Sequence, residues 1–199
     1  MKKRSAAVRR KTKETDIEVK VVIDGSGKSA IKTGVGFLNH MLELFAHHGL
    51  FDLTVLVKRS DLDVDLHHTN EDIGICMGQA FKKALGGKRG IKRFGFYAPM
   101  DEALAAVVLD ISGRPSLYFD LKSRYKYMST RDYSIIDARE FLKALAFNCG
   151  VNMHVDIIKG EDAHHILEAI FKALAKALDG ATQIDRRRGG ALPSTKGKL

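Results

Sequence analysis

The residues best suited to chemistry form a short motif that the chain carries twice. Residues 65–72 read Asp-Leu-His-His-Thr-Asn-Glu-Asp and residues 162–169 read Asp-Ala-His-His-Ile-Leu-Glu-Ala, so both copies contain Asp-x-His-His-x-x-Glu. At about 100° per residue, the first histidine and the glutamate of a helical copy lie about 40° apart, and the second histidine lies about 60° beyond the glutamate. Imidazole and carboxylate ligands suit Mn, Fe, Co, Ni and Zn. The repeated motif therefore predicts metal binding.

A duplicated helix-capping sequence without a metal is the structural alternative. It does not explain why histidine, which is a poor capping residue, recurs as a pair in both copies. An amphipathic helical pattern follows each copy, over residues 73–85 and 166–178. The motif and the helix after it are thus duplicated together, which favours the metal interpretation.

The composition of the 199 residues, with 45% hydrophobic side chains, is typical of a soluble globular protein. The sequence contains no apolar run of membrane-spanning length, and its basic N-terminus lacks the apolar segment of a signal peptide. Cys76 and Cys149 lie within apolar helical patterns, so we expect buried free thiols, as in a reducing compartment. These features predict a cytoplasmic protein without a membrane partner.

The net charge of +9 is concentrated at the two ends of the chain. Residues 1–13 hold seven basic residues and residues 186–199 hold five, and neither segment has an acidic residue. These twelve charges exceed the net charge by three, so residues 14–185 carry −3. A basic stripe on a folded face is therefore not indicated, which argues against a nucleic-acid-binding module. The basic ends are expected to be solvated tails, or arms that reach an anionic group.

Hydrophobic periodicity predicts alternating strands and helices. We expect a strand over residues 17–23 that forms a hairpin with 29–33 around the turn at 24–27, and we expect Pro99 to separate two strands. The polar, tyrosine-rich residues 122–132 are expected to form a loop or an edge. The remaining strands are expected over 52–58, 92–98, 103–111, 116–121 and 151–158, and the helices over 37–48, 73–85, 137–149 and 166–178.

The repeat is larger than the two motifs. In each half a helix leads through a glycine into a strand, and the strand leads into the helix that the motif begins. We expect an α/β (α+β) fold built as a tandem repeat of two similar halves, about 10–90 and 91–182, whose helices cover one face of a mixed sheet. Since no Pro/Gly/Ser-rich linker separates the halves, residues 1–199 are expected to form a single domain that ends in a basic tail at 183–199.

Several further stretches, in order along almost the whole chain, resemble the imidazoleglycerol-phosphate dehydratase family. Two are the short runs Arg-Lys-Thr-Lys-Glu-Thr at 10–15 and Met-Asp-Glu-Ala-Leu at 100–104. The others lie at residues 36–42, 48–53, 67–74, 90–95, 110–115, 164–173 and 187–197. The poorest match is at 122–137.

The resemblance implies the dehydration of D-erythro-imidazole glycerol phosphate to imidazole acetol phosphate in histidine biosynthesis. It also implies two Mn²⁺ ions per active site, a fold like the second domain of ribosomal protein S5, and a homo-oligomer of 24 subunits with sites shared between subunits. The metal ligands implied by position are His40, His67, His68, Glu71, His164, His165 and Glu168.

The resemblance also implies roles in binding and proton transfer. Glu14 would be the base that takes the proton from carbon. The residues expected to contact the substrate, mostly its phosphate, are Glu14, His48, Arg93, Arg114, Lys172, Ser194 and Lys196. Of these, Lys172 has independent support, because it stands four residues after Glu168 on the same helix face.

The main departure from the family pattern is Glu140, which stands where the family has an eighth ligand, a histidine. A carboxylate can still bind Mn²⁺, so Glu140 is a candidate ligand, and His154 is the alternative. Asn39 and Leu44 also depart, since the family usually has Asp and Gln there, and both could alter hydrogen bonds around the ligands.

Two other functions are compatible with the same residues. A binuclear metallohydrolase acting on a phosphorylated small molecule would use the same ligand set, and only substrate trials separate it from a lyase. A metal-dependent assembly protein would retain the ions without turnover, and Glu140, Asn39 and Leu44 would then be marks of a degenerate enzyme.

Overall fold

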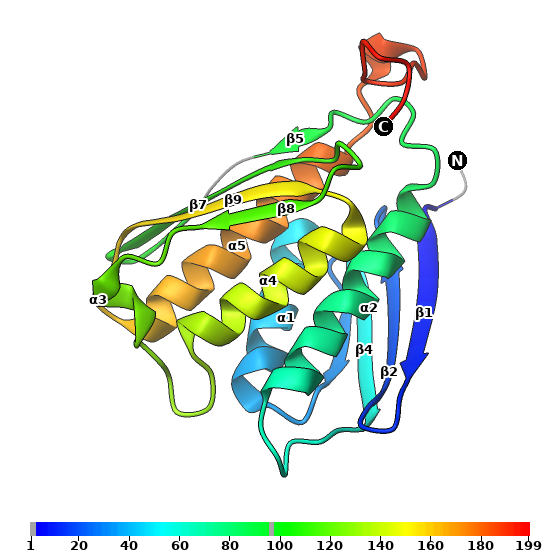
Figure 1. Cartoon of the computed structure of the whole chain (residues 1–199). Helices are drawn as coiled ribbons and strands as arrows, with labels where there is room; N and C mark the ends of the chain where they lie inside the picture. Colours follow the sequence, from blue (N-terminus) through cyan, green and yellow to red (C-terminus); the bar gives the residue numbers. More distant parts are fainter. Residues whose placement is uncertain (1–2, 96–97) are drawn as a thin grey trace.

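Two β-sheets form the outer layers of the molecule, and helices α1, α2, α4 and α5 lie between them (Figure 1). The computed structural model describes residues 3–95 and 98–199. The helices are α1 (Gly36–Gly49), α2 (His67–Leu85), α4 (Ile135–Cys149) and α5 (Ala163–Thr182), with a short α3 (Ser123–Lys126) and a 3-10 turn at Arg186–Arg188. Helix α2 packs along α4, and α1 packs along α5.

The two sheets share one topology. The first has the order β1 (Ser5–Lys11), β2 (Asp16–Val22), β4 (Asp52–Arg59) and β3 (Ser29–Lys32), with β3 parallel to β4 and the other pairs antiparallel. The second has the order β5 (Phe94–Gly95), β7 (Ala103–Asp110), β9 (Asn152–Lys159) and β8 (Ser116–Phe119), with β8 parallel to β9. Strand β6 (Ala98–Met100) also pairs with β7. The tandem repeat predicted from the sequence is therefore confirmed.

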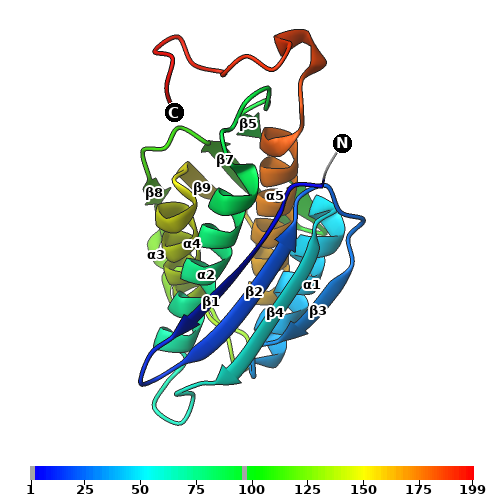
Figure 2. The same ribbon diagram turned by 90° about the vertical axis from the view of Figure 1, so that its right-hand side faces the viewer.

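The predicted hairpin between residues 17–23 and 29–33 is wrong. Strand β4 lies between β2 and β3, so β3 pairs in parallel with β4 and reaches it through the crossover helix α1 (Figure 2). Alternation of polar and apolar residues identifies a strand, but it does not identify the strand's partner.

Four other expectations need correction. Residues 5–11 are not part of a tail, because they form β1, and Val8 on this strand is buried in the core. Pro99 lies within the edge strand β6 rather than between strands, where its missing N–H costs no ladder hydrogen bond. Residues 122–132 include the helix α3. Of the strand expected over 92–98, residues 94–95 and 98 are in strands, and 96–97 lie outside the described residues.

Glycines allow the two helix layers to approach closely. A Cβ atom added to Gly78 of α2 would lie 2.6 Å from the carbonyl oxygen of Leu145 and 2.8 Å from the backbone nitrogen of Cys149, both in α4. Backbone atoms cannot rotate away as a flexible side chain can, so only a glycine fits here without moving the helix. No helix in the described ranges is both long and apolar enough to cross a membrane.

We expect the substitution Gly78→Ala to destabilise the protein by about 1–3 kcal/mol, because it forces α2 away from α4. Gly180→Ala in α5 is the matched control: its added Cβ would find its nearest neighbour at 3.9 Å. Since alanine favours a helix over glycine by about 1 kcal/mol, the control should be neutral or stabilising. Chemical denaturation at one protein concentration measures both variants. Equal stability of the two would contradict this account of the α2–α4 packing.

Candidate metal centre

The leading aspartate of each motif accepts hydrogen bonds at the start of the helix that carries the histidines. Asp162 Oδ1 accepts hydrogen bonds from the backbone N–H groups of His164 at 2.6 Å and His165 at 3.3 Å. Asp65 Oδ1 accepts one from the N–H of His67 at 2.7 Å. These bonds satisfy N–H groups that the first helical turn leaves without a partner. The aspartates therefore have a structural role, and the histidines leave the first turn of α2 and of α5.

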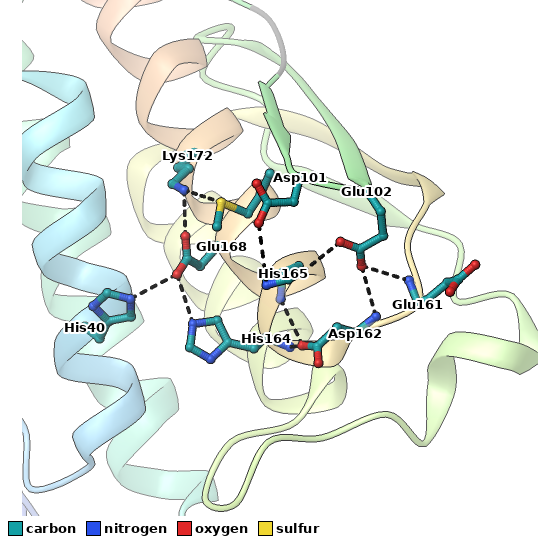
Figure 3. A network of polar contacts seen from close by, with 10 residues as sticks. His40, Asp101, Glu102, Glu161, Asp162, His164, His165, Glu168 and Lys172 are labelled. Atoms are coloured by element: carbon teal, nitrogen blue, oxygen red, sulfur yellow. Dashed lines mark hydrogen bonds and ion pairs between the residues drawn. The ribbon is translucent and has the colours of Figure 1, made fainter.

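The second motif meets α1 in a compact cluster. Glu168 Oε1 lies 3.1 Å from Nε2 of His40 and 2.9 Å from Nε2 of His164, and Oε2 accepts a bond from Nζ of Lys172 at 2.6 Å (Figure 3). The carboxylate is buried, with 6% of the residue exposed. Burial raises the pKa of Glu168, but the bonds from Lys172, His40 and His164 outweigh it and lower this pKa to about 2. One ligand atom from each of His40, His164 and Glu168 lies within 4.8 Å of the others, a spacing that could hold one metal ion.

Aromatic packing joins this cluster to the first motif. The ring of Phe37 lies edge-on to His164 at 5.1 Å and stacks on Tyr133 at 5.9 Å, measured between centroids. The hydroxyl of Tyr133 donates to Oδ1 of Asn70, inside the first motif, at 3.0 Å. Phe37 of α1 and Tyr133 therefore connect the two motif copies through direct contacts.

The first motif has a cluster of different composition. Nδ1 of His68 lies 2.6 Å from Oδ2 of Asp61, and Oδ1 of Asp61 accepts a bond from Oγ1 of Thr69 at 2.9 Å. The bond to Asp61 raises the pKa of His68. The carboxylate of Glu14 lies 4.0 Å from the same Nδ1, with 60% of its side chain exposed. The structure therefore brings the predicted base to a predicted ligand, and it adds Asp61, which was not predicted.

The remaining predicted ligands of the first repeat are more widely spaced. Nε2 of His67 lies 3.9 Å from Oε2 of Glu71. Glu140 pairs with Lys143 at 3.6 Å, and within the described ranges no hydrogen bond or ion pair joins it to His67. Helix α4 carries Glu140 along α2, just as α1 carries its repeat partner His40 along α5. The repeat therefore places Glu140 on the helix that faces the first motif.

Three other residues were considered near the ligands, namely His154, Asn39 and Leu44. Their side chains contact residues other than the predicted metal ligands. His154 lies exposed on the outer face of the second sheet, stacked on Tyr118 at 4.5 Å, so it faces away from the helices that carry the motifs. Asn39 Oδ1 accepts bonds from the N–H of Thr33 at 2.9 Å and its hydroxyl at 2.7 Å. The side chain of Leu44 packs against the core.

Within each motif the two histidines point in different directions. The ring centroids of His164 and His165 are 6.1 Å apart with planes at 79°, and those of His67 and His68 are 5.7 Å apart with planes at 70°. Figure 3 shows His165 turned away from Glu168 and toward Glu102, whose Oε2 lies 2.7 Å from Nδ1 of the ring. The bond from His165, with backbone N–H bonds, lowers the pKa of Glu102 to about 2. A single motif therefore cannot direct all three side chains at one ion.

Of the predicted phosphate contacts, Lys172 lies beside Glu168, whereas Arg93 and Ser194 lie at the other end of α5. Arg93 and Ser194 line a pocket of about 390 Å³ together with Arg188, Leu192, Pro193 and Thr195. The guanidinium of Arg93 forms a two-pronged ion pair with Asp110, 2.7 Å from Nη2 to Oδ2, and donates to the carbonyl of Pro193 at 2.8 Å. Arg114 and Lys196 are exposed.

The chain's own helix separates this pocket from the metal cluster. The backbone N–H of Arg93 bonds to the carbonyl of Ala181 in the last turn of α5, 17 residues after His164 in the first turn. At 1.5 Å per residue the two ends are about 26 Å apart. Figure 2 shows the C-terminal segment extending beyond this far end. One chain therefore does not bring the pocket of Arg93 and Ser194 to the predicted metal ligands.

Two predicted substrate contacts lie nearer the cluster. Lys172 donates to Glu168 and also lies 2.8 Å from the sulfur of Met100. His48 is in the last turn of α1, half-buried beside α5. Burial, and then the charges of His47, Lys172 and Lys176, lower the pKa of His48, which favours its neutral imidazole.

The sequence model of the imidazoleglycerol-phosphate dehydratase family matches residues 33–178. The chain is 55% identical to the imidazoleglycerol-phosphate dehydratase of Caldanaerobacter subterraneus subsp. tengcongensis and 52% identical to that of Methylorubrum extorquens, each over 197 residues, 98% of this chain and 100% of the relative.

Two solved structures of enzymes with the same name are similar to this one. The imidazoleglycerol-phosphate dehydratase of Staphylococcus aureus matches with a TM-score of 0.79 and 37% identity, over 91% of this chain and 99% of that one. The enzyme from Pyrococcus furiosus matches with a TM-score of 0.81 and 36% identity, over 96% of this chain and all of that one.

Proposed function

This chain belongs to the imidazoleglycerol-phosphate dehydratase family, and from that premise we propose that it dehydrates D-erythro-imidazole glycerol phosphate to imidazole acetol phosphate with two Mn²⁺ ions in each active site. As a member it is a hydro-lyase of histidine biosynthesis. The observation that carries the metal dependence is the convergence of His40, His164 and Glu168, from two helices, on one point.

The donor set fits a divalent ion of the Mn²⁺ class. Two imidazole nitrogens lie about 3 Å from one buried carboxylate oxygen, and imidazole and carboxylate are ligands that such an ion accepts. His40, His164 and Glu168 would hold one ion, and their repeat partners Glu140, His67 and Glu71 would hold the other. His68 and His165 point elsewhere, so they would complete sites on other copies of the chain. Bound Mn²⁺ would supply Lewis acidity and a template for the imidazole ring of the substrate.

Glu14 is proposed as the general base. Its carboxylate is exposed, lies 4.0 Å from the ring of His68, and accepts no hydrogen bond within residues 3–95 and 98–199. An uncommitted carboxylate next to a ligand can take a proton from a substrate carbon and return it elsewhere. Neutral His48 would contact the substrate without adding positive charge.

The phosphate is proposed to bind at the pocket of Arg93 and Ser194, with Arg114, Lys196 and, from the metal site, Lys172 as further contacts. Guanidinium groups suit phosphate because they present paired donors. Since this pocket lies about 26 Å from His164 along α5, another copy of the chain would bring its pocket to the metal ions. This separation supports a homo-oligomer with shared sites, for which we expect the 24 subunits that the sequence resemblance implies.

A cytoplasmic location is part of the same proposal. Cys76 and Cys149 are buried free thiols, as expected in a reducing compartment. Burial raises the pKa of Cys76 to about 11 and that of Cys149 to about 12. Both groups therefore stay protonated and poorly reactive at neutral pH.

Turnover of imidazole glycerol phosphate by chelator-stripped protein tests the proposed function. Without metal we expect the rate of ketone formation to fall by more than about 10³-fold, since metal-ion stabilisation contributes several kcal/mol, and added Mn²⁺ should restore it. Full turnover in the stripped protein would contradict the metal dependence. Absence of turnover with Mn²⁺ bound would contradict the substrate assignment and favour the assembly protein or the hydrolase.

A further inference from the structure

In both repeats a carboxylate contacts Nδ1 of the second histidine of the motif. Oδ2 of Asp61 lies 2.6 Å from Nδ1 of His68, and Oε2 of Glu102 lies 2.7 Å from Nδ1 of His165. The two carboxylates come from different places: Asp61 is in the loop between β4 and α2, and Glu102 is in the turn between β6 and β7. The duplication alone does not explain this contact, because the residues that make it are not repeat partners.

Each carboxylate is itself fixed by its second oxygen at the start of the motif helix. Oδ1 of Asp61 accepts a bond from the hydroxyl of Thr69 at 2.9 Å. Oε1 of Glu102 accepts bonds from the backbone N–H groups of Glu161 at 3.3 Å and Asp162 at 3.2 Å (Figure 3). Each acid therefore ties the loop before the helix to the imidazole ring that leaves the helix.

A carboxylate on Nδ1 determines which nitrogen of the ring is free. The ring donates its Nδ1–H to the acid, so the proton of a neutral imidazole stays on Nδ1 and the lone pair is on Nε2. The same bond holds the plane of the ring, and metal-binding histidines commonly have such an outer partner.

The two repeats differ in whether the glutamate of the hairpin turn contacts the second histidine of the motif. The turn between β1 and β2 carries Glu14 and corresponds to the turn between β6 and β7 that carries Glu102. In the second repeat Glu102 reaches the histidine. In the first, Asp61 already occupies Nδ1 of His68, and Glu14 remains 4.0 Å from it with an exposed side chain. Because Asp61 makes this hydrogen bond, the carboxylate of Glu14 does not make it.

We propose that Asp61 and Glu102 are positioning residues that hold His68 and His165 with Nε2 directed at a metal ion. This inference rests on the proposed Mn²⁺ function. In it Asp61 and Glu102 act through the histidine rings and not as ligands, and it can be measured as metal affinity without any substrate.

The experiment titrates Mn²⁺ into metal-stripped full-length protein and follows free Mn²⁺ by electron paramagnetic resonance. The variants are Asp61→Asn and Glu102→Gln, which keep side-chain shape, and the controls are Asp63→Asn and Glu161→Gln. The controls remove the same charge from exposed side chains of neighbouring loop residues. We expect each variant to weaken its class of Mn²⁺ sites by about 10–100-fold, and each control to bind as the native protein does.

Carboxylate-retaining variants separate positioning from folding. Asp61→Glu and Glu102→Asp should recover part of the lost affinity, because they keep an acceptor for Nδ1–H. Native-like Mn²⁺ binding by Asp61→Asn and Glu102→Gln would overturn the inference and leave the proposed function intact. Equal losses in Asp61→Asn and Asp61→Glu would also overturn it, since loop shape would then matter and not the acid. Native protein that binds no Mn²⁺ would instead overturn the proposed function.

Discussion

Replacing Glu14 by glutamine is expected to lower kcat by about 10²–10⁴-fold while the Mn²⁺ content stays unchanged. Glutamine keeps the shape of the side chain but cannot accept a proton from carbon. The carboxylate of Glu14 makes no hydrogen bond within the described ranges and its side chain is 60% exposed, so its removal leaves no buried group without a partner. The loss should therefore be in proton transfer and not in stability.

The turn that carries Glu14 is held independently of that side chain. The hydroxyl of Thr15 donates to Oδ2 of Asp72 at 2.5 Å, and Arg10 donates to the same oxygen at 2.7 Å. The hydroxyl of Thr12 accepts a bond from the backbone N–H of Glu14 at 3.1 Å. Because Asp72 follows Glu71 in α2, these bonds fix the base relative to the first motif.

Single-turnover kinetics with saturating Mn²⁺ measures the effect of Glu14→Gln. Glu43→Gln is the control, because it removes a carboxylate from the exposed face of α1. An unchanged kcat in Glu14→Gln would show that another group takes the proton. A parallel loss of bound Mn²⁺ would assign Glu14 to metal binding instead.

The pairing of His164 with Glu168 could be predicted from the sequence because its geometry is local. Within one helical turn, spacing alone determines that His164 and Glu168 share a face, and the structure has them 2.9 Å apart. His40 lies on another helix, 128 residues from Glu168, so only the family resemblance identified it. Asp61 and Glu102 were missed because each lies in a loop, where no periodicity relates a side chain to the histidine that it contacts.

In the fold, too, local features could be predicted and contacts between distant residues could not. The elements and their duplication follow from periodicity, whereas strand order depends on contacts between distant residues. The basic residues of 1–13, with no acidic residue among them, predict a solvated tail or arm, yet Val8 fills a core position and Arg9 pairs with Asp16 across the hairpin. A run of basic residues identifies a solvated surface, but a strand can have such a surface on one face and a buried residue on the other.

Replacing Glu168 by glutamine is expected to remove one of the two classes of Mn²⁺ sites and to lower kcat by more than about 10³-fold. Metal-free protein should also lose stability, by an amount on the order of 3 kcal/mol, because Lys172 would keep a partly buried charge without its partner. The pKa of Glu168 is about 2 instead of the usual 4.5, so the folded state binds fewer protons than the unfolded state. Its contribution to stability is therefore complete above about pH 4.5 and is lost as the pH falls toward 2.

The double variant Glu168→Gln, Lys172→Met separates the two roles of this carboxylate. Removing the ammonium together with its partner leaves no uncompensated charge, so metal-free stability should return toward that of the native protein. Mn²⁺ binding should not return, because the ligand is still absent. Urea denaturation of metal-free protein and Mn²⁺ titration measure the two quantities separately. Recovery of Mn²⁺ binding in the double variant would mean that the charge balance around His40 and His164, and not the oxygen of Glu168, holds the ion.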